Sequence, residues 1–385
     1  MEKRLVSRMV EDTFKGWKAL LQKPEIRAFM NEIKSNNFSW EQMSLIRGGF
    51  EVGLTPEQVR LYANENYTVK CMDQIRQGLI NGLTAEHIEV YKTFPYEKMG
   101  QIRYGFECGL NFEQVALYAN IHMLWQQMEQ IRLGLQAGLE IEKVKVYADP
   151  ELSHLKMEQI RKAFENGLEI KEVTLLNQPC FNEEQMEQIR LGFEKKLAYE
   201  QVVSYADADY TEGTMSWIRS AYQQGYDQEK IALLLDKSFD EDQIVRIYRG
   251  LEAGFTLDEL KLFADPAYGY DQMEVIRVGI KKLGVEKVKL YLNPNFESSA
   301  MEEIYKGLED ENLSVEQVKL YAKEDLDVRI MYQLRRGLLY GMSEERIEKL
   351  ANSKLDWEEI RNIVDSESKQ DEKSYSEILL ELLLS

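Results

Sequence analysis

The chain has 385 residues and a formal net charge of −19, from 48 Lys and Arg against 67 Asp and Glu. This acidity argues against a general binder of nucleic acids or anionic membranes, although a local basic face is compatible with it. Apolar residues make up 44% and charged residues 30%, which is typical of a folded protein and excludes a disordered acidic chain.

Cysteine usage and hydropathy indicate the compartment. The three cysteines are too few and too widely spaced for a disulfide framework, which favours a reducing compartment. The N-terminal stretch has no apolar signal core, and no run approaches the ~18 apolar residues that a membrane span needs. We therefore expect a cytoplasmic protein without a membrane anchor.

Residues 1–38 are expected to form an N-terminal helical cap. They lack the repeat that organises the rest of the chain, and they contain the apolar residues Phe14, Trp17, Leu20 and Phe29. The terminal units of a repeat array must be atypical, because their outer faces meet solvent.

A 29-residue repeat organises residues 39–364. Its central phrase is MEQIRLGLQAGL at Met128, and successive copies are spaced by 26 to 30 residues. Copies begin at Met43, Met72, Met99, Met128, Met157, Met186, Met215, Ile244, Met273, Met301 and Met331, with a truncated copy at Trp357. Such a period indicates a repeat array rather than several globular domains.

Each repeat predicts two helices, counted here from the motif's first residue as position zero. Helix A begins at −3, after a capping residue at −4 that pairs with Gln at −1, as Ser39 does with Gln42. Apolar residues at 0, +3 and +7 form its buried stripe, and Gly at +10 ends it. Helix B is shorter and is capped at +12, as in Thr55 followed by Pro56.

These features predict an all-α fold, an α-solenoid of about eleven to twelve two-helix repeats with N- and C-terminal caps. Neither helix of a repeat can bury its apolar face alone, so stacking supplies the core. We find no strand pattern in the sequence.

The segment 365–385 reads as a polar linker followed by an apolar helix, Ile378–Leu384. This helix is too short to span a bilayer. We expect it to cap the last repeat. The alternative is a helix-in-groove contact with a second copy or with a partner, which would allow self-association through these residues.

The repeats resemble the MEQIR-type helical repeats of proteins from anaerobic Gram-positive bacteria and their mobile elements. The resemblance covers roughly residues 38–364 and rests on M-x-x-I-R-x-G-[LF]-x-x-G-L followed by V-x-[LV]-Y-A-[DN]. It implies the repeat fold and no catalytic residue.

Arginine recurs at +4, on the border of the buried face. The main members are Arg47, Arg76, Arg103, Arg132, Arg161, Arg190, Arg219, Arg277 and Arg335. We expect a structural ladder in which each guanidinium bonds a neighbouring carboxylate or helix-B carbonyl and packs on the Tyr at +19, itself expected in the core. The alternative is a line of cations that faces a phosphate backbone or an acidic partner. The constancy of the position favours the ladder, because binding surfaces normally vary between repeats.

The positions that vary are the candidates for recognition. Position +5 points outward, and position +2 changes from Gln to other residues late in the array. The candidate partner-binding residues at these positions are Tyr104, Leu133, Leu191, Trp217, Arg246 and Arg249. Their apolar and aromatic character favours a protein partner over a polyanion.

The sequence carries no signature of catalysis. His87, His122 and His154 have no metal-ligand spacing, and no nucleophile elbow, phosphate loop or dinucleotide fingerprint occurs. We therefore predict no catalytic, cofactor-binding or metal-binding residue.

The expected function is that of a non-catalytic helical-repeat protein that engages a macromolecular partner, which we take to be a protein, along an extended face. One alternative is an acidic inhibitor or decoy of a nuclease or defence complex, encoded on a mobile element. The other is a nucleic-acid binder that uses the arginine ladder, although the net charge disfavours it.

Overall fold

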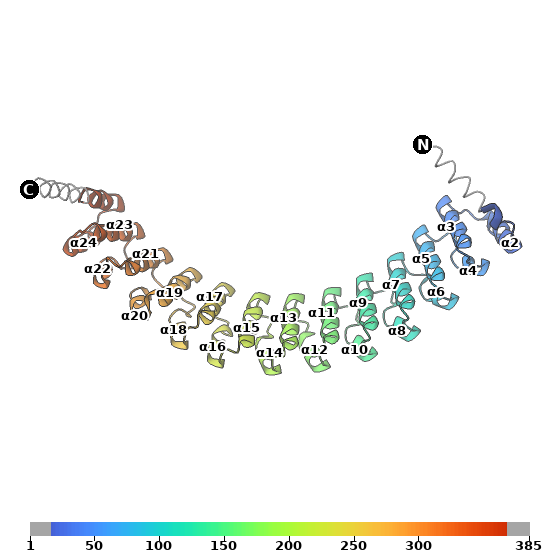
Figure 1. Cartoon of the computed structure of the whole chain (residues 1–385), viewed down its shortest axis with the longest axis horizontal. Helices are drawn as coiled ribbons and strands as arrows, with labels where there is room; N and C mark the ends of the chain where they lie inside the picture. Colours follow the sequence, from blue (N-terminus) through green and yellow to red (C-terminus); the bar gives the residue numbers. More distant parts are fainter. Residues whose placement is uncertain (1–16, 368–385) are drawn as a thin grey trace, which may run out of the picture. The chain divides into compact units, whose positions relative to one another are not determined.

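The computed structural model describes residues 17–367. Within that range every regular element is a helix, so the all-α prediction is confirmed (Figure 1). The predictions for Phe14 and for the apolar segment Ile378–Leu384 lie outside the described residues.

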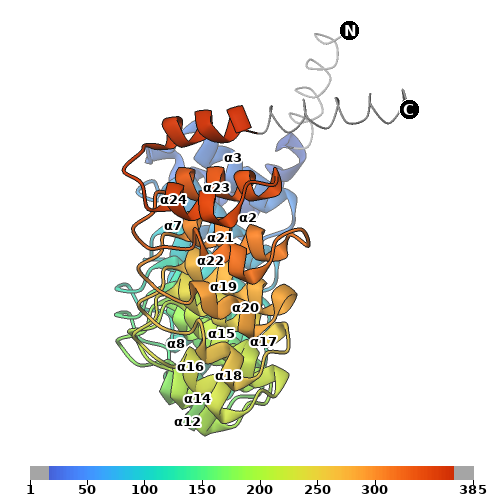
Figure 2. The same ribbon diagram turned by 90° about the vertical axis from the view of Figure 1, so that its left-hand side faces the viewer.

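The chain divides into two compact units, which meet between Glu194 and Lys195. In each unit long helices alternate with short helices along the chain, and each long helix packs against the next long one. Within each unit the long helices form one row and the short helices another (Figure 1), and Figure 2 views unit 2 from its C-terminal side. We call the long helices A helices and the short ones B helices.

Unit 1 opens with α2 (Pro24–Glu32) and η1 (Ile33–Ser35). Its A helices are α3 (Trp40–Glu51), α5 (Val69–Ile80), α7 (Tyr96–Glu107), α9 (Trp125–Gln136), α11 (His154–Glu165) and α13 (Glu183–Glu194). Its B helices are α4 (Pro56–Arg60), α6 (Ala85–Tyr91), α8 (Phe112–Ala116), α10 (Ile141–Lys145) and α12 (Ile170–Leu176).

Unit 2 continues the same alternation. Its A helices are α15 (Glu212–Gln224), α17 (Glu241–Glu252), α19 (Tyr270–Leu283), α21 (Ser298–Glu309) and α23 (Val328–Leu339), followed by a helix over residues 357–367. Its B helices are α14 (Tyr199–Tyr205), α16 (Gln228–Leu234), α18 (Leu257–Lys261), α20 (Val285–Val288) with η2 (Lys289–Tyr291), α22 (Val315–Lys319) and α24 (Glu344–Ala351).

The starts of the A helices follow from their caps. Every A helix from α3 to α23 begins at position −3, as predicted. At α3 the Ser39 hydroxyl accepts from the amide of Gln42 at 3.2 Å, while the Gln42 side chain accepts from the amide of Ser39 at 2.8 Å. The last helix begins instead at Trp357, because the Asp356 carboxylate accepts from the two amides that follow that residue.

The ends of the A helices depend on a left-handed residue. The glycines at +10 have φ between 74° and 93°, which a residue without a Cβ adopts at little cost. In the repeat of α13, Lys196 takes this place with φ 66°. The predicted glycine termination is therefore confirmed, and one lysine performs the same role.

The core joins the two rows of helices through tyrosine at +19. Seven tyrosines are fully buried, at 0% exposure: Tyr62, Tyr91, Tyr118, Tyr147 and Tyr205 at +19, Tyr291 at +18 and Tyr321 at +20. The hydroxyl oxygen of Tyr147 lies 2.0 Å from the position that a Cβ on Gly134 would occupy, so the mid-helix glycine admits the ring. Where Ala163 replaces that glycine, the B helix carries Leu176 instead of tyrosine. The B helix of the same repeat thus packs closely against the A helix at the mid-helix glycine of position +6.

At the start of unit 1, α2 packs against the first repeat. Phe29 is buried, and its ring lies 5.4 Å from the ring of Phe50. The guanidinium of Arg60 lies over the same Phe29 ring, also at 5.4 Å.

Candidate partner-binding surfaces

The arginines at +4 link neighbouring A helices of unit 1. On α7, α9, α11 and α13 the arginine donates through Nε to the side-chain oxygen of the Gln at +2 on the preceding A helix. The bonds are Arg103 to Gln74 at 2.9 Å, Arg132 to Gln101 at 2.8 Å, Arg161 to Gln130 at 3.0 Å and Arg190 to Gln159 at 3.0 Å. A glutamine that the sequence analysis placed on the varying surface is therefore the acceptor of the ladder.

The same guanidiniums are also bonded within their own helix. Arg103 donates to Glu107 at 2.6 Å and Arg190 to Glu194 at 2.6 Å, whereas Arg132 donates to Gln136 at 2.7 Å. The Arg103 and Arg190 side chains are only 7% exposed. A charged donor with two acceptors in a nearly buried setting has little capacity left for a phosphate group.

The ladder lies over the buried tyrosines. Burial raises the pKa of Tyr118 and Tyr147, and the charges of Arg132 and Arg161 partly oppose that rise. Each arginine therefore lies beside a tyrosine hydroxyl of the preceding repeat. The hydrogen-bond partners of the ladder arginines are mainly the Gln at +2 and the acceptor at +8, and the expected packing on the Tyr at +19 stays a prediction.

The other predicted members have different partners. Arg47 contacts Glu51 at 3.1 Å and Arg76 contacts Asp73 at 2.6 Å, both within one helix. Further along, Arg219 donates to Ser216, Arg277 pairs with Glu274, and Arg335 donates to Glu303 on the preceding A helix at 3.0 Å.

The ladder is interrupted at α17 and α19 of unit 2. Position +4 of α17 holds Tyr248, whose ring lies 4.8 Å from that of Trp217 at +2 of α15. On α19, Arg277 meets Arg246 at the position where other repeats supply an acceptor. Both guanidiniums contact Glu274 instead, at 2.6 Å for Arg277 and 3.4 Å for Arg246. The hydrogen bond from Arg277, more than the charges of Arg277 and Arg246, lowers the pKa of Glu274.

The six candidate partner-binding residues have different degrees of exposure. Tyr104 is 47% exposed, and the Arg103 guanidinium lies 4.3 Å from its ring centre. Leu133, Leu191, Trp217 and Arg246 are half-buried, while Arg249 is exposed. They lie on the A helices α7, α9, α13, α15 and α17, and the structure divides them between the two units.

The first residues of several A helices are a further set of exposed side chains. Trp40, Val69 and Trp125 begin α3, α5 and α9 and are exposed, Trp40 by 80% and Trp125 by 40%. Positions −3, +1 and +5 lie four residues apart, so they share one side of each helix with Tyr104 and Leu133. We call Trp40, Val69, Tyr104, Trp125 and Leu133 the unit 1 A face. The signal that predicts it is the aromatic or apolar residue at −3 in four successive repeats.

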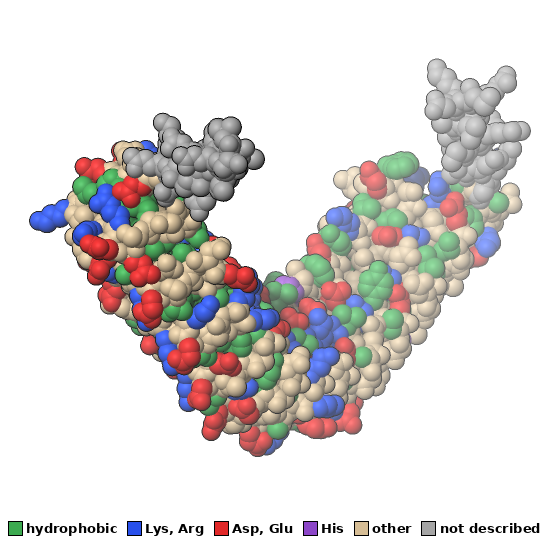
Figure 3. Space-filling model, turned by 60° about the vertical axis from the view of Figure 1, so that its left-hand side comes forward, with side chains coloured by type: hydrophobic (Ala, Val, Ile, Leu, Met, Phe, Trp, Pro, Cys, Tyr) green, Lys and Arg blue, Asp and Glu red, His purple; other side chains and the backbone are tan. Residues whose placement is uncertain are grey.

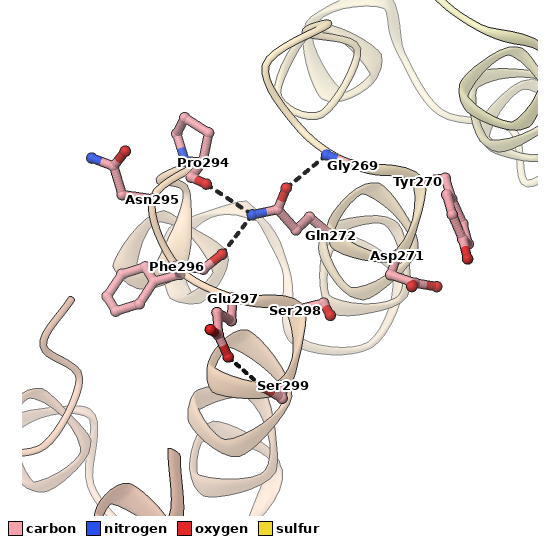
Figure 4. Close-up of a pocket in the computed structure, with 10 residues that line it drawn as sticks. All are labelled: Gly269, Tyr270, Asp271, Gln272, Pro294, Asn295, Phe296, Glu297, Ser298 and Ser299. Carbon is pink, nitrogen blue, oxygen red and sulfur yellow. Dashed lines mark hydrogen bonds between the residues drawn. The ribbon is translucent and has the colours of Figure 1, made fainter. Parts of the chain in front are cut away.

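The glutamines at −1 form a second set of links, visible for Gln272 in Figure 4. Its side chain accepts from the amide of Gly269 and donates to the carbonyls of Pro294 and Phe296 in the next repeat, at 3.0 and 2.5 Å. These residues line an open notch of about 480 Å³ between the start of α19 and the turn before α21. The side chain of Tyr270 points away from Gln272. The hydrogen bonds of Gln272 join this repeat to the next, and the notch is not a candidate ligand-binding site.

Potential metal ligands do not gather in the part of the chain that the structure describes. Residues 17–367 contain no group of three or more His, Cys, Asp and Glu side chains that could hold a metal ion. His87 is part of a local cap, because its Nδ1 accepts from the amide of Thr84 and its ring stacks on Phe112 at 4.9 Å. In the same part of the chain, no helix is long and apolar enough to cross a bilayer.

Comparison of the chain with protein-family models and with curated proteins finds no match.

Proposed function

We propose that the chain is a non-catalytic helical-repeat protein that binds another protein along the exposed side of its A helices. The observation that carries this proposal is the unit 1 A face. Trp40, Tyr104 and Trp125 are exposed, and none of them has a part in the hydrogen bonds that join the repeats. Exposed aromatic side chains on one surface are typical of protein interfaces.

The proposed architecture is an array of about eleven to twelve repeats with a cap at each end, in a reducing, cytoplasmic setting. The common start of the A helices at −3 supports the repeat assignment. The packing of Phe29 on Phe50 supports residues 1–38 as the N-terminal cap. The cap formed by Ile378–Leu384 stays a prediction.

The arginine ladder gives little support to nucleic-acid binding. Its members in unit 1 donate to glutamine and glutamate, and their side chains are mostly buried. Release of counterions from a phosphate backbone requires cations that are accessible to that backbone.

The alternative function, an acidic inhibitor or decoy of a nuclease or defence complex, has equally little support. A protein that imitates a polyanion needs a surface of one charge sign. Figure 3 shows acidic, basic and apolar side chains interspersed on the face that it displays.

The proposal is tested by affinity capture from the organism that encodes the chain, followed by quantitative mass spectrometry. The variant Trp40→Ser with Trp125→Ser removes the largest side chains of the unit 1 A face. The control Ile170→Ser removes an apolar side chain that is 49% exposed on α12, a B helix of the same unit. A protein retained by the wild type and the control but lost by the double variant, and then bound directly in calorimetry, supports the proposal. Equal recovery by all three proteins would contradict it.

A further inference from the structure

The interruption of the ladder at α17 and α19 leaves positive charge on the A-helix side of unit 2. Arg246 and Arg277 share the one carboxylate of Glu274, at 3.4 and 2.6 Å. In the unit 1 ladder, by contrast, each guanidinium has its own glutamine on the preceding helix. Two cations with one anion give a locally uncompensated charge.

Arg249 adds a third cation to this group. It lies at +5 of α17, it is exposed, and it forms no ion pair within residues 17–367. Besides Arg277 and Arg246, the charge of Arg249 lowers the pKa of Glu274, so it acts on the same carboxylate. Three guanidiniums thus act on the one carboxylate of Glu274. We call Arg246, Arg249 and Arg277 the arginine cluster.

Aromatic and apolar side chains border the arginine cluster. The ring of Tyr270 lies 5.6 Å from the Arg246 guanidinium and is 44% exposed. Val245 on α17 and Val278 on α19 are half-buried, at the +1 and +5 positions of the same helix side. The exposed Arg249 therefore offers a guanidinium to a carboxylate next to surface that an apolar side chain can cover.

We propose that the arginine cluster binds an acidic segment of a partner protein, in which Asp or Glu residues alternate with apolar ones. This inference rests on the proposed function and adds the chemistry of the partner. Charge complementarity requires that the bound segment be negatively charged. The bordering Tyr270 and valines favour a peptide, because a peptide can supply apolar side chains.

A nucleic acid fits the cluster less well than a peptide. A phosphate backbone needs a continuous row of cations, whereas Glu212 on α15 and Glu302 on α21 are exposed on the flanking A helices. The chain as a whole carries −19, which repels a long polyanion. At physiological ionic strength, salt largely screens interactions between exposed charges that are more than about 8 Å apart. A short acidic segment therefore interacts mainly with the arginine cluster and little with the rest of the chain.

The test uses fluorescence anisotropy with the full chain and a fluorescein-labelled peptide of alternating glutamate and leucine. The variant Arg249→Glu reverses the exposed charge of the cluster. The control Lys261→Glu makes the same change of charge sign on α18, where the lysine is exposed. We expect the wild type and the control to bind the peptide alike, and Arg249→Glu to bind it at least about tenfold more weakly. Unchanged circular dichroism melting of both variants establishes that they fold.

Three results would overturn the inference. They are no binding of the peptide by the wild type, equal binding by Arg249→Glu, or equal binding of the same peptide with lysine in place of glutamate. A labelled oligothymidylate that displaces the peptide and also depends on Arg249 would assign the cluster to nucleic acid instead. The double variant Trp40→Ser with Trp125→Ser separates the two proposals, because it should lose the captured partner while it keeps the peptide.

Discussion

Two stretches of the molecule follow the same repeat but are held together differently. In α7 to α10 of unit 1, Arg103 and Arg132 donate to glutamines on the preceding A helices, and the tyrosines Tyr118 and Tyr147 fill the core. In α15 to α18 of unit 2, the ring of Tyr248 packs on Trp217. The core positions of the two tyrosines hold Leu234 and Phe263 there. Hydrogen bonds between repeats are thus replaced by ring contacts.

The comparison distinguishes the repeat positions that hold neighbouring helices together from the positions that vary at the surface. Where the ladder is intact, arginine, glutamine and tyrosine change little from repeat to repeat, because each contacts the others. Where the mid-helix glycine changes, the tyrosine at +19 changes with it, as in Ala221 with Leu234, whereas Arg190 and Gln159 keep their hydrogen bond although Leu176 replaces that tyrosine. In unit 2, Arg246 and Arg277 share the carboxylate of Glu274, whereas each ladder arginine of unit 1 has a glutamine on the preceding A helix.

The largest expected effect is a loss of stability at alkaline pH that originates in the tyrosine repeats. Burial raises the pKa of Tyr118 and Tyr147 above the ordinary value near 10. Their contribution to stability is therefore complete below pH 10 and is lost as the pH rises through the folded-state pKa. Each buried tyrosine should cost about 1.4 kcal/mol of unfolding free energy per pH unit above 10. Urea unfolding at pH 7 and pH 11, followed by circular dichroism, measures this loss.

Phenylalanine variants identify the source of the alkaline effect. Tyr118→Phe with Tyr147→Phe removes two ionisable groups, and the Tyr147 hydroxyl has no hydrogen-bond partner within the described range, so the cost at pH 7 should be small. The variant should lose less stability than the wild type at pH 11, whereas Tyr104→Phe, at an exposed position, should behave as the wild type does. An equal alkaline loss in all three proteins would refute the assignment.

A smaller effect distinguishes a ladder arginine from an exposed one. Arg132→Ala leaves the side-chain oxygens of Gln101 and Gln136 without their donor, which should lower the unfolding free energy by about 1–3 kcal/mol. Arg249→Ala removes an exposed side chain without an ion pair among residues 17–367 and should change it by less than about 0.5 kcal/mol. Paired urea titrations compare the two variants. Similar changes in both would mean that the interruption in unit 2 has no structural basis.

Much of the fold could be predicted from sequence, because it depends on local rules. The starts of the A helices follow from caps such as Ser39 with Gln42, and their ends follow from glycines that adopt positive φ. The burial of tyrosine at +19 follows from helical spacing. All of these features are set within a few residues of the chain.

The acceptors of the ladder could not be predicted in the same way. Gln101 and Arg132 are 31 residues apart, and their contact depends on how far each A helix is rotated and shifted against the next. Gln at +2 therefore looked like variable surface. The pattern at −3, as in Trp40 and Trp125, indicates where a helix begins, but it contains no information on which side of that helix the neighbouring helices leave exposed.

The smallest expected effect comes from restoring the ladder in unit 2. Arg246 and Arg277 are 31 residues apart, the spacing that joins Gln101 to Arg132, so a glutamine at 246 would place an acceptor before Arg277. Arg246→Gln should raise the unfolding free energy by about 0.5–1 kcal/mol, since it adds one hydrogen bond and removes a repulsion between like charges. Arg246→Met is the control, because it removes the charge without supplying the acceptor. If Arg246→Gln stabilises the chain more than Arg246→Met and also weakens the acidic peptide, the interruption trades stability for binding. If both variants are less stable than the wild type, Arg246 belongs to the packing of α17 on α19, and the arginine cluster is structural.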